Sequence, residues 1–516
     1  MPTNEQYLVA REVITSSLGS FLPEILLAVT ICSLFLMDLI MKGRHPGRAA
    51  AVSVTGLVLT GLALVATWPA GSDPLFGWKT GDVQHGLLGH DAFAWFFKAL
   101  ILLGTLVVIP MVMQQPAFQR RRMGEFHALL LGATLGMFLM AGAENLLMVY
   151  LGVEFASMGS YLLTSFVKRD LKGSEAGLKY VIYGSVASGV MVFGLSFLYG
   201  MTGSLQISDI AEKLVAGGLP EVGLLLTGVM VFGGFAYKMA AFPMHFWCPD
   251  VYEGAPTPVT AYLSVASKAA GFAVFVRFLM GFGEGFQVTF AIEGGVLDQV
   301  DFGWPVIIAA ASALSMTVGN LAALWQTNVK RMLAYSSVAH AGYLLMGVVV
   351  LDPGVSGGEQ FGPLIYYFIA YFVMNLGAFY IVNLIASKEG REDLEGYRDL
   401  GSRSPWLAAF LVIFLLSLLG IPPTGGFVGK LQLFMAVIDK QIYWLAVLAG
   451  VNSAISAYYY FKLLKAMYLE TPEGGVVRPF RAGAANMALL GFFALLVLVL
   501  GVAFSPVVDL VQNFSL

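Results

Sequence analysis

Long runs of apolar residues, separated by short polar breaks, make up most of the chain. A helix needs about 20 apolar residues to cross the hydrocarbon core of a membrane, and fourteen runs come close to that length. They lie near residues 18–41, 49–69, 92–114, 126–143, 145–167, 178–201, 221–247, 257–281, 304–325, 332–351, 362–387, 404–435, 441–467 and 486–512. The pattern predicts an all-α polytopic membrane protein with about fourteen transmembrane helices, in a single membrane domain over residues 1–516.

The composition supports this class of protein and limits the cofactors that the chain could bind. The chain of 516 residues is 58% hydrophobic and only 12% charged, whereas a soluble domain has about 25% charged residues. Its two cysteines, Cys32 and Cys248, cannot ligate an iron–sulfur cluster, which needs about four ligands. No nucleotide-binding or metalloprotease motif appears. We therefore expect no cofactor in this chain and no nucleic-acid partner, with any redox chemistry carried out by other chains.

The distribution of basic residues predicts the orientation. The loops after the odd-numbered runs are mostly rich in Lys and Arg, as in Arg120, Arg121 and Arg122. The loops on the opposite side carry only Arg11, Lys79, Lys213 and Lys440. Because basic loops stay in the cytoplasm, both termini are predicted to lie outside it.

Two short stretches match each other inside the seventh and twelfth runs. They read GGFAYKMAAF at 233–242 and GGFVGKLQLF at 425–434. Because the two runs are five spans apart, the copies cross the membrane in opposite directions, which indicates an inverted repeat. The predicted repeats are helices 4–8, over 126–281, and helices 9–13, over 304–467. Pro243 and the stretch IPPTGG (421–426) lie beside the copies, so helices seven and twelve are predicted to be broken.

Five ionisable residues lie well inside predicted spans and form the candidate site: Glu154, Lys238, Lys268, His340 and Lys430. An intramembrane charge is costly and usually functional. Lys238 is the natural partner of Glu154, which lies at a similar predicted depth. A desolvated lysine beside a carboxylate can gain and lose a proton, so this set suits a proton relay. We interpret the charges nearer the span ends as interfacial or structural; these are Glu24, Asp38, Lys98, Glu144 and Arg277. His245 and Asp250 could form a proton entry.

The alternative interpretations remain open for each candidate. The glycines could serve only helix packing while the lysines reach an interface. Glu154 could be a protonated side chain bonded to a carbonyl, and His340 a satisfied core histidine. The hydroxyls of Ser336 and Ser337 could support a water chain, although small polar residues also simply pack helices.

At these residues the sequence resembles the antiporter-like membrane subunits of respiratory complex I, which share their fold with Mrp-type cation/proton antiporters. The motifs that carry the resemblance are YLGVEF, GGFAYKMAAFPMHFWCPDVYEGAPTPVTAYLSVASKAAGF, VKRMLAYSSVAHAGYLLMG and GIPPTGGFVGKLQLF. The resemblance covers essentially the whole chain, and together these motifs are very specific.

The resemblance implies fourteen helices with two inverted five-helix repeats and broken helices seven and twelve. It implies functional roles for Glu154, Lys238, Lys268 and Lys430, and a place for His340 on the central polar axis. Quinone reduction elsewhere would drive proton movement, with FMN, iron–sulfur clusters and quinone held in partner subunits. The implied partners are an adjacent antiporter-like subunit, small core membrane subunits and lipids in a bacterial inner membrane. An Mrp-type antiporter subunit and the equivalent subunit of a ferredoxin-dependent photosynthetic complex remain alternatives.

Overall fold

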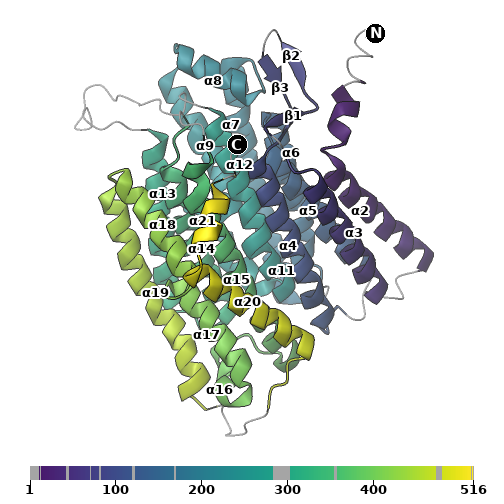
Figure 1. Ribbon diagram of the computed structural model, residues 1–516, viewed down its shortest axis with the longest axis vertical. Helices are drawn as coiled ribbons and strands as arrows, with labels where there is room; N and C mark the ends of the chain where they lie inside the picture. The colour runs from purple at the N-terminus through teal and green to yellow at the C-terminus, as the bar shows by residue number, and fades with distance from the viewer. Residues whose placement is uncertain are drawn as a thin grey trace.

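The computed structural model is an all-helical bundle with two small hairpins at one end (Figure 1). It describes residues 11, 13–41, 46–69, 71–80, 83–118, 123–167, 170–282, 303–353, 357–471, 479–512 and 514. The basic loop residues Arg120, Arg121 and Arg122 lie outside these ranges, so the orientation of the chain stays a prediction.

The described part of the first half of the chain is mainly helical, with four short strands. The helices are α2 (Leu22–Met41), α3 (Pro46–Ala66), α4 (Ala92–Gln114), α5 (Met123–Gly142), α6 (Leu146–Thr164), α7 (Leu171–Thr202), α8 (Ile207–Ala216), α9 (Glu221–Met239) and α10 (Trp247–Gly254). The strands β1 (Asp73–Leu75) and β4 (Leu88–His90) pair antiparallel, as do β2 (Trp78–Thr80) and β3 (Val83–His85). These strands lie between α3 and α4 and were not predicted.

The next segment is nearly continuous: α11 (Thr257–Tyr262) runs into the π-helical turn η1 (Leu263–Ser267) and then into α12 (Lys268–Gly281). The second half contains α13 (Trp304–Leu324), α14 (Val329–Val349), η3 (Gly358–Phe361), α15 (Gly362–Glu389), η4 (Leu394–Tyr397), α16 (Leu400–Arg403), α17 (Pro405–Leu419), α18 (Gly425–Asp439), α19 (Tyr443–Leu469), α20 (Ala484–Val502) and α21 (Ser505–Val511).

The described helices agree with a polytopic membrane protein. Twelve of them are long and apolar enough to cross a membrane. The other two predicted spans lie at 404–435, where the structure has the two short helices α17 and α18, and at 441–467, which α19 covers. The all-α class is confirmed, whereas the count of fourteen membrane crossings stays a prediction.

The two predicted breaks have the same local structure. α9 ends at Met239 and α17 ends at Leu419, and the next residue in each case, Ala240 or Gly420, has a left-handed backbone with φ of 56° or 89°. Each of these residues donates its N–H to carbonyls three and four positions earlier, which satisfies part of the helix end. The two GGFxxK copies are placed differently relative to the helix breaks. Lys238 lies before the first break, whereas Lys430 lies after the second break.

Two helix pairs also pack in the same way. An added Cβ at Gly136 of α5 would lie 2.5 Å from the backbone N of Ala156 in α6. An added Cβ at Gly319 of α13 would lie 2.6 Å from the backbone N of Ala339 in α14. Each glycine therefore lets the two helix backbones touch, as small residues do in membrane bundles.

The starts of α6 and α14 match as well. Each helix begins after an asparagine, Asn145 or Asn328, whose side chain accepts an N–H of the first turn. Each asparagine also forms an isolated antiparallel bridge, to Gln206 and to Asp393 respectively. These local matches agree with a repeated plan, while the extents 126–281 and 304–467 and the inverted relation of the repeats stay predictions.

Replacing Gly136 or Gly319 by alanine is expected to lower the stability of the purified protein, by about 1–3 kcal/mol each, because the new methyl group overlaps the facing backbone. Gly132 is the matched control on α5, since nothing lies within 4 Å of its Cβ position. Thermal unfolding in detergent measures the difference. Equal melting temperatures for Gly136→Ala and Gly132→Ala would contradict this packing.

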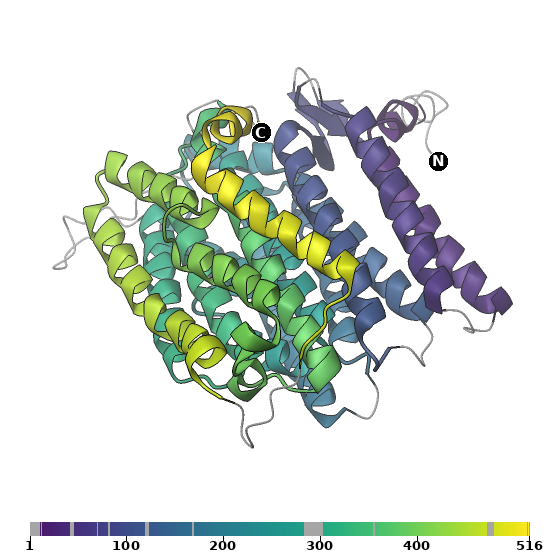
Figure 2. The same cartoon turned by 60° about the horizontal axis from the view of Figure 1, so that its bottom comes forward.

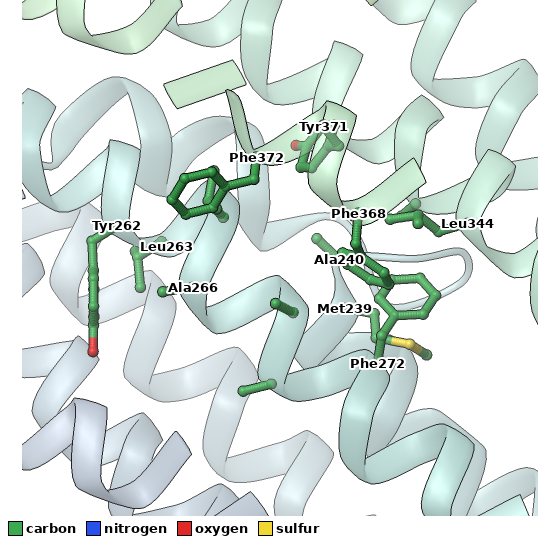
Figure 3. Packing of buried hydrophobic residues seen from close by; sticks show 14 of the residues in the cluster. Met239, Ala240, Tyr262, Leu263, Ala266, Phe272, Leu344, Phe368, Tyr371 and Phe372 are labelled. Atoms are coloured by element: carbon green, nitrogen blue, oxygen red, sulfur yellow. The ribbon is translucent and has the colours of Figure 1, made fainter. Parts of the chain in front are cut away.

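The centre of the bundle lies where the two helix sets meet. α12, α14 and α15 are buried along almost their whole length, whereas α2 and α20 expose most of theirs. Figure 2 shows α2 and α3 at one edge and α19 at the opposite edge, with α20 crossing the surface between them. In Figure 3, Met239 at the end of α9, Phe272 of α12 and Phe368 of α15 pack together. The candidate residues lie along this interior.

Candidate functional site

Lys238 lies in the last turn of α9 and is buried, with 3% of its surface exposed. Its ammonium donates a hydrogen bond to the Ser157 Oγ of α6 at 3.1 Å. Glu154 lies one turn before Ser157, and one of its carboxylate oxygens is buried without a hydrogen-bond partner. No ion pair joins Glu154 to Lys238 in the described part of the chain. Ser157, which sequence reasoning missed, is the direct partner of the lysine.

Lys268 is the first residue of α12 and follows directly after the π-helical turn η1. Its ammonium donates to the backbone carbonyl of Ser337 on α14 and lies 6.0 Å from the Tyr371 ring centre. One turn later, Gly271 packs against the stem of Lys238, since an added Cβ there would lie 3.2 Å from the Lys238 Cγ. α12 thus brings the Lys238 region and the Lys268 region together.

His340 is buried on α14 and has a tyrosine hydroxyl at each ring nitrogen. Nδ1 lies 2.6 Å from the Tyr367 hydroxyl, and Nε2 lies 3.4 Å from the Tyr460 hydroxyl. Tyr460 also bonds the Ser336 Oγ at 2.6 Å, and Tyr371 bonds the Ser337 Oγ at 2.9 Å. A neutral imidazole has one donor and one acceptor nitrogen, so this ring is placed to accept a proton at one nitrogen and release one at the other.

Lys430 lies in α18, just after the second break, and is also buried. Its ammonium donates to the Leu418 and Leu419 carbonyls at 3.1 and 2.9 Å and to the Ser453 Oγ at 3.2 Å. Those carbonyls end α17, where the helix dipole is negative. The ammonium also lies 4.5 Å from the Tyr343 ring centre, in the range of a cation–π contact.

The structure thus arranges the five candidate residues along the bundle interior. On α14, Ser337, His340 and Tyr343 follow one another at helical spacing, so they link Lys268 at one end to Lys430 at the other. Sequence reasoning named the serines but missed the tyrosines. A signal for Tyr367 and Tyr371 was present, because two tyrosines four residues apart share one helix face.

The residues predicted as a proton entry lie at the α9–α10 break and in α10. Asp250 accepts hydrogen bonds from Lys179 at 2.7 Å and from Arg331 at 2.6 Å. Partial burial raises the pKa of this carboxyl, but the two cations lower it more, so the net pKa is below its usual range. His245 packs against Phe246, and its Nδ1 is buried without a hydrogen-bond partner.

Among the charges near the span ends, four form ion pairs: Glu24, Lys98, Glu144 and Arg277. Lys98 and Glu24 form a buried ion pair at 2.6 Å. Arg277 pairs with Asp91 at 2.6 Å and with Glu144 at 3.2 Å. Within the described ranges, no group of three His, Cys, Asp or Glu side chains is placed to hold a metal ion.

A family model described as "NADH:quinone oxidoreductase/Mrp antiporter, TM" matches residues 143–456 of the chain. The chain is 41% identical over 500 residues to NADH-quinone oxidoreductase subunit N 2 of Chloroherpeton thalassium, with 96% of this chain and 94% of the relative covered. It is 42% identical over 506 residues to NADH-quinone oxidoreductase subunit N of an Anaeromyxobacter species, with 95% and 94% covered.

The fold is also similar to a solved structure. A chain of respiratory complex I from Thermus thermophilus, determined with bound aureothin, matches with a TM-score of 0.77 and 30% identity. The match covers 95% of this chain and all of that one.

Proposed function

The chain belongs to the NADH:quinone oxidoreductase/Mrp antiporter membrane family, and we propose that it is the N-type antiporter-like subunit of a proton-translocating NADH:quinone oxidoreductase. The observation that carries the proposal is the interior row of Lys238, Lys268, His340 and Lys430, which are buried and contacted by serine and tyrosine groups, with the partly exposed Glu154 one turn from Ser157. An apolar membrane bundle has no structural need for such a row.

The row moves protons by transfer between neighbouring groups. Attraction to the Glu154 carboxylate holds a proton on Lys238, and separation of the two releases it. Lys268 passes protons toward His340 through the hydroxyls of Ser337 and Tyr371. At His340, one ring nitrogen takes a proton as the other gives one up. Tyr367 and Tyr460 supply the adjoining O–H groups.

The chain itself carries out no redox step in this proposal. Quinone reduction in partner subunits, which hold FMN and iron–sulfur clusters, supplies the energy as electrostatic and conformational change. The partners are the adjacent antiporter-like subunit, the small core membrane subunits and lipids of a bacterial inner membrane. Both termini lie outside the cytoplasm.

The family description also includes Mrp antiporters, and an Mrp-type subunit shares the fold and the lysines. The names and the near-complete coverage of the two relatives favour the oxidoreductase subunit. The equivalent subunit of a ferredoxin-dependent photosynthetic complex differs in its electron donor, which lies in other chains.

Affinity purification of the tagged protein in mild detergent, followed by an NADH oxidation assay, tests the proposal. Co-purification of flavin and iron–sulfur subunits with quinone-dependent NADH oxidation is the expected result. Flavin-free partners with sodium/proton exchange in liposomes would instead establish an antiporter. Iron–sulfur partners without NADH oxidation would establish the ferredoxin-dependent complex.

Replacing Tyr460 by phenylalanine is expected to slow coupled proton translocation about three- to tenfold, because it removes the hydroxyl between Ser336 and His340 at little cost in volume. Tyr366→Phe is the matched control, since in the described part of the chain the Tyr366 hydroxyl bonds only the Leu500 carbonyl, which lies outside the row. Proton uptake per NADH oxidised by inverted membrane vesicles measures both. Equal values for the two variants would exclude Tyr460 from the relay.

A further inference from the structure

One face of α4 carries a stripe of buried polar residues that the relay above does not use. Asp91 at the helix N-cap, Lys98 and Thr105 are 2%, 4% and 0% exposed. They are seven residues apart, which is close to two turns, so they lie on one face with steps of about 10 Å. The rest of α4 is almost entirely apolar. The stripe runs from the end of the bundle that carries the hairpins toward its centre (Figure 1).

At its outer end the stripe meets a pocket. Arg277 donates to both oxygens of Asp91, at 2.6 and 2.8 Å, and to Glu144 at 3.2 Å. The Glu144 side chain is 27% exposed and lines a pocket together with Ser72, Gln206 and Ser208. Burial raises the pKa of Glu144, Arg277 opposes that change, and Asp91 adds to it. The net pKa of Glu144 is above its usual value, so this carboxyl takes up a proton at a higher pH than an ordinary surface carboxylate does.

In the middle of the stripe, the Lys98 ammonium lies 2.6 Å from the Glu24 carboxylate of α2, and both side chains are buried. Removing such a pair from water costs several kcal/mol per ion, and a hydrophobic pair of the same volume often holds helices equally well. An ionisable pair at this depth is the usual mark of an ion or proton pathway.

At the inner end, three hydroxyls form a chain. The Thr105 Oγ1 lies 3.0 Å from the Thr134 Oγ1, which lies 2.9 Å from the Tyr262 hydroxyl. All three residues are buried. Each hydroxyl both donates and accepts, so the chain can carry a proton in either direction.

This inner end lies close to the central row. Gly104 packs α4 against Ala266, since an added Cβ at Gly104 would lie 3.6 Å from the Ala266 Cβ. Figure 3 shows Tyr262 and Ala266 on the same helix, and Ala266 is two residues before Lys268. Between them, the Ser267 Oγ is buried without a hydrogen-bond partner.

We propose that the α4 stripe is a second proton path, which connects the pocket at Glu144 with Lys268 by way of Asp91, Lys98 and Thr105. The inference rests on the proposed function and adds a route along α4 from the central row to the predicted outer side. At Lys98, one N–H bond breaks as its proton passes on, and a new N–H bond forms with a proton from the other side. No electrons move, and the Glu24 carboxylate balances the charge of Lys98 whenever its amine is protonated. The lysine stem and a few waters span the gaps between the residues.

Thr105→Val tests the path, because it removes one hydroxyl at nearly constant volume. Thr60→Val is the matched control: Thr60 is buried on the neighbouring helix α3, and among the described residues its hydroxyl bonds only the Gly56 carbonyl of its own helix. In inverted vesicles driven by NADH, Thr105→Val is expected to lower the number of protons moved per NADH about three- to tenfold. Thr60→Val should match the wild type.

Two further variants separate the possible outcomes. The double variant Glu24→Gln/Lys98→Met keeps the shape of the pair without an unpaired charge and is expected to lower the proton yield as Thr105→Val does. If the double variant fails to assemble, the proton yield of Thr105→Val alone tests the α4 path. Wild-type proton yield in Thr105→Val, together with loss of yield in Lys268→Met, would overturn the α4 path and leave the proposed function standing. Wild-type yield in Lys268→Met as well would overturn both.

Discussion

Replacing Lys238 by alanine is expected to reduce coupled proton translocation by the assembled complex about a hundredfold or more, since a positioned proton-transfer group typically contributes about 10²–10⁴-fold. Lys238 is the buried cation that reaches α6 from the first helix break, and its ammonium bonds Ser157, one turn from Glu154. Alanine leaves the apolar surroundings intact, so the complex should still assemble.

The control for Lys238→Ala is Lys465→Ala. Lys465 is an exposed lysine on α19 that pairs with Glu470, and its removal should leave translocation unchanged. Native gels establish assembly, and proton uptake with simultaneous NADH oxidation establishes coupling. Unchanged proton uptake in Lys238→Ala would remove this lysine from the relay. Loss of assembly would show that its role is structural.

Replacing Arg277 by alanine is expected to destabilise the protein by about 3–5 kcal/mol, because it leaves the buried Asp91 carboxylate without its cation. Arg277 also donates its Nε–H to the Ala141 carbonyl at 2.9 Å. The same change therefore removes a hydrogen bond between α12 and the end of α5. The melting temperature in detergent and the amount of assembled complex report the loss.

Arg331→Ala provides the comparison for Arg277→Ala. Arg331 pairs with Asp250 and Glu253, but its side chain is 28% exposed, so its removal should cost about 1 kcal/mol or less. The double change Arg277→Met/Asp91→Asn should recover much of the stability, since no buried charge is left alone. Similar melting temperatures for Arg277→Ala and Arg331→Ala would show that the Asp91 pair contributes little.

The apolar runs predicted the helices well because a membrane leaves the backbone few alternatives to a helix. The two breaks were also predictable, since Pro243 and the IPPTGG stretch interrupt the hydrogen-bond ladder in an otherwise apolar run. The GGFxxK match, however, paired Lys238 with Lys430, although Lys238 lies before its helix break and Lys430 lies after its break. Helix caps and glycine contacts depend on three-dimensional packing, which a short sequence match does not reveal.

The candidate residues were found from the cost of burying a charge, which can be argued from sequence alone. The hydrogen-bond partners of these residues could not be found in this way. The predicted partner of Lys238 was a carboxylate, whereas its hydrogen bond goes to Ser157, because the rotation of α6 against α9 decides which face meets the lysine. Of the tyrosines around His340, Tyr367 and Tyr371 come from α15, and Tyr460 comes from α19, much further along the chain. The charges near the span ends were interpreted as interfacial or structural, but the sequence did not show which segments pair, such as Glu24 of α2 with Lys98 of α4.

The contacts of Lys430 tie its protonation to the shape of the second helix break. Its ammonium has three N–H bonds, and three oxygens receive them: the Leu418 carbonyl, the Leu419 carbonyl and the Ser453 hydroxyl. A neutral amine has two N–H bonds and a lone pair, so release of the proton leaves two N–H bonds for the two carbonyls and a lone pair for the Ser453 hydroxyl. That hydroxyl then turns from acceptor to donor and gives up its own bond to the Leu419 carbonyl. The proton on Lys430 thereby sets the direction of the hydrogen bonds at the second break.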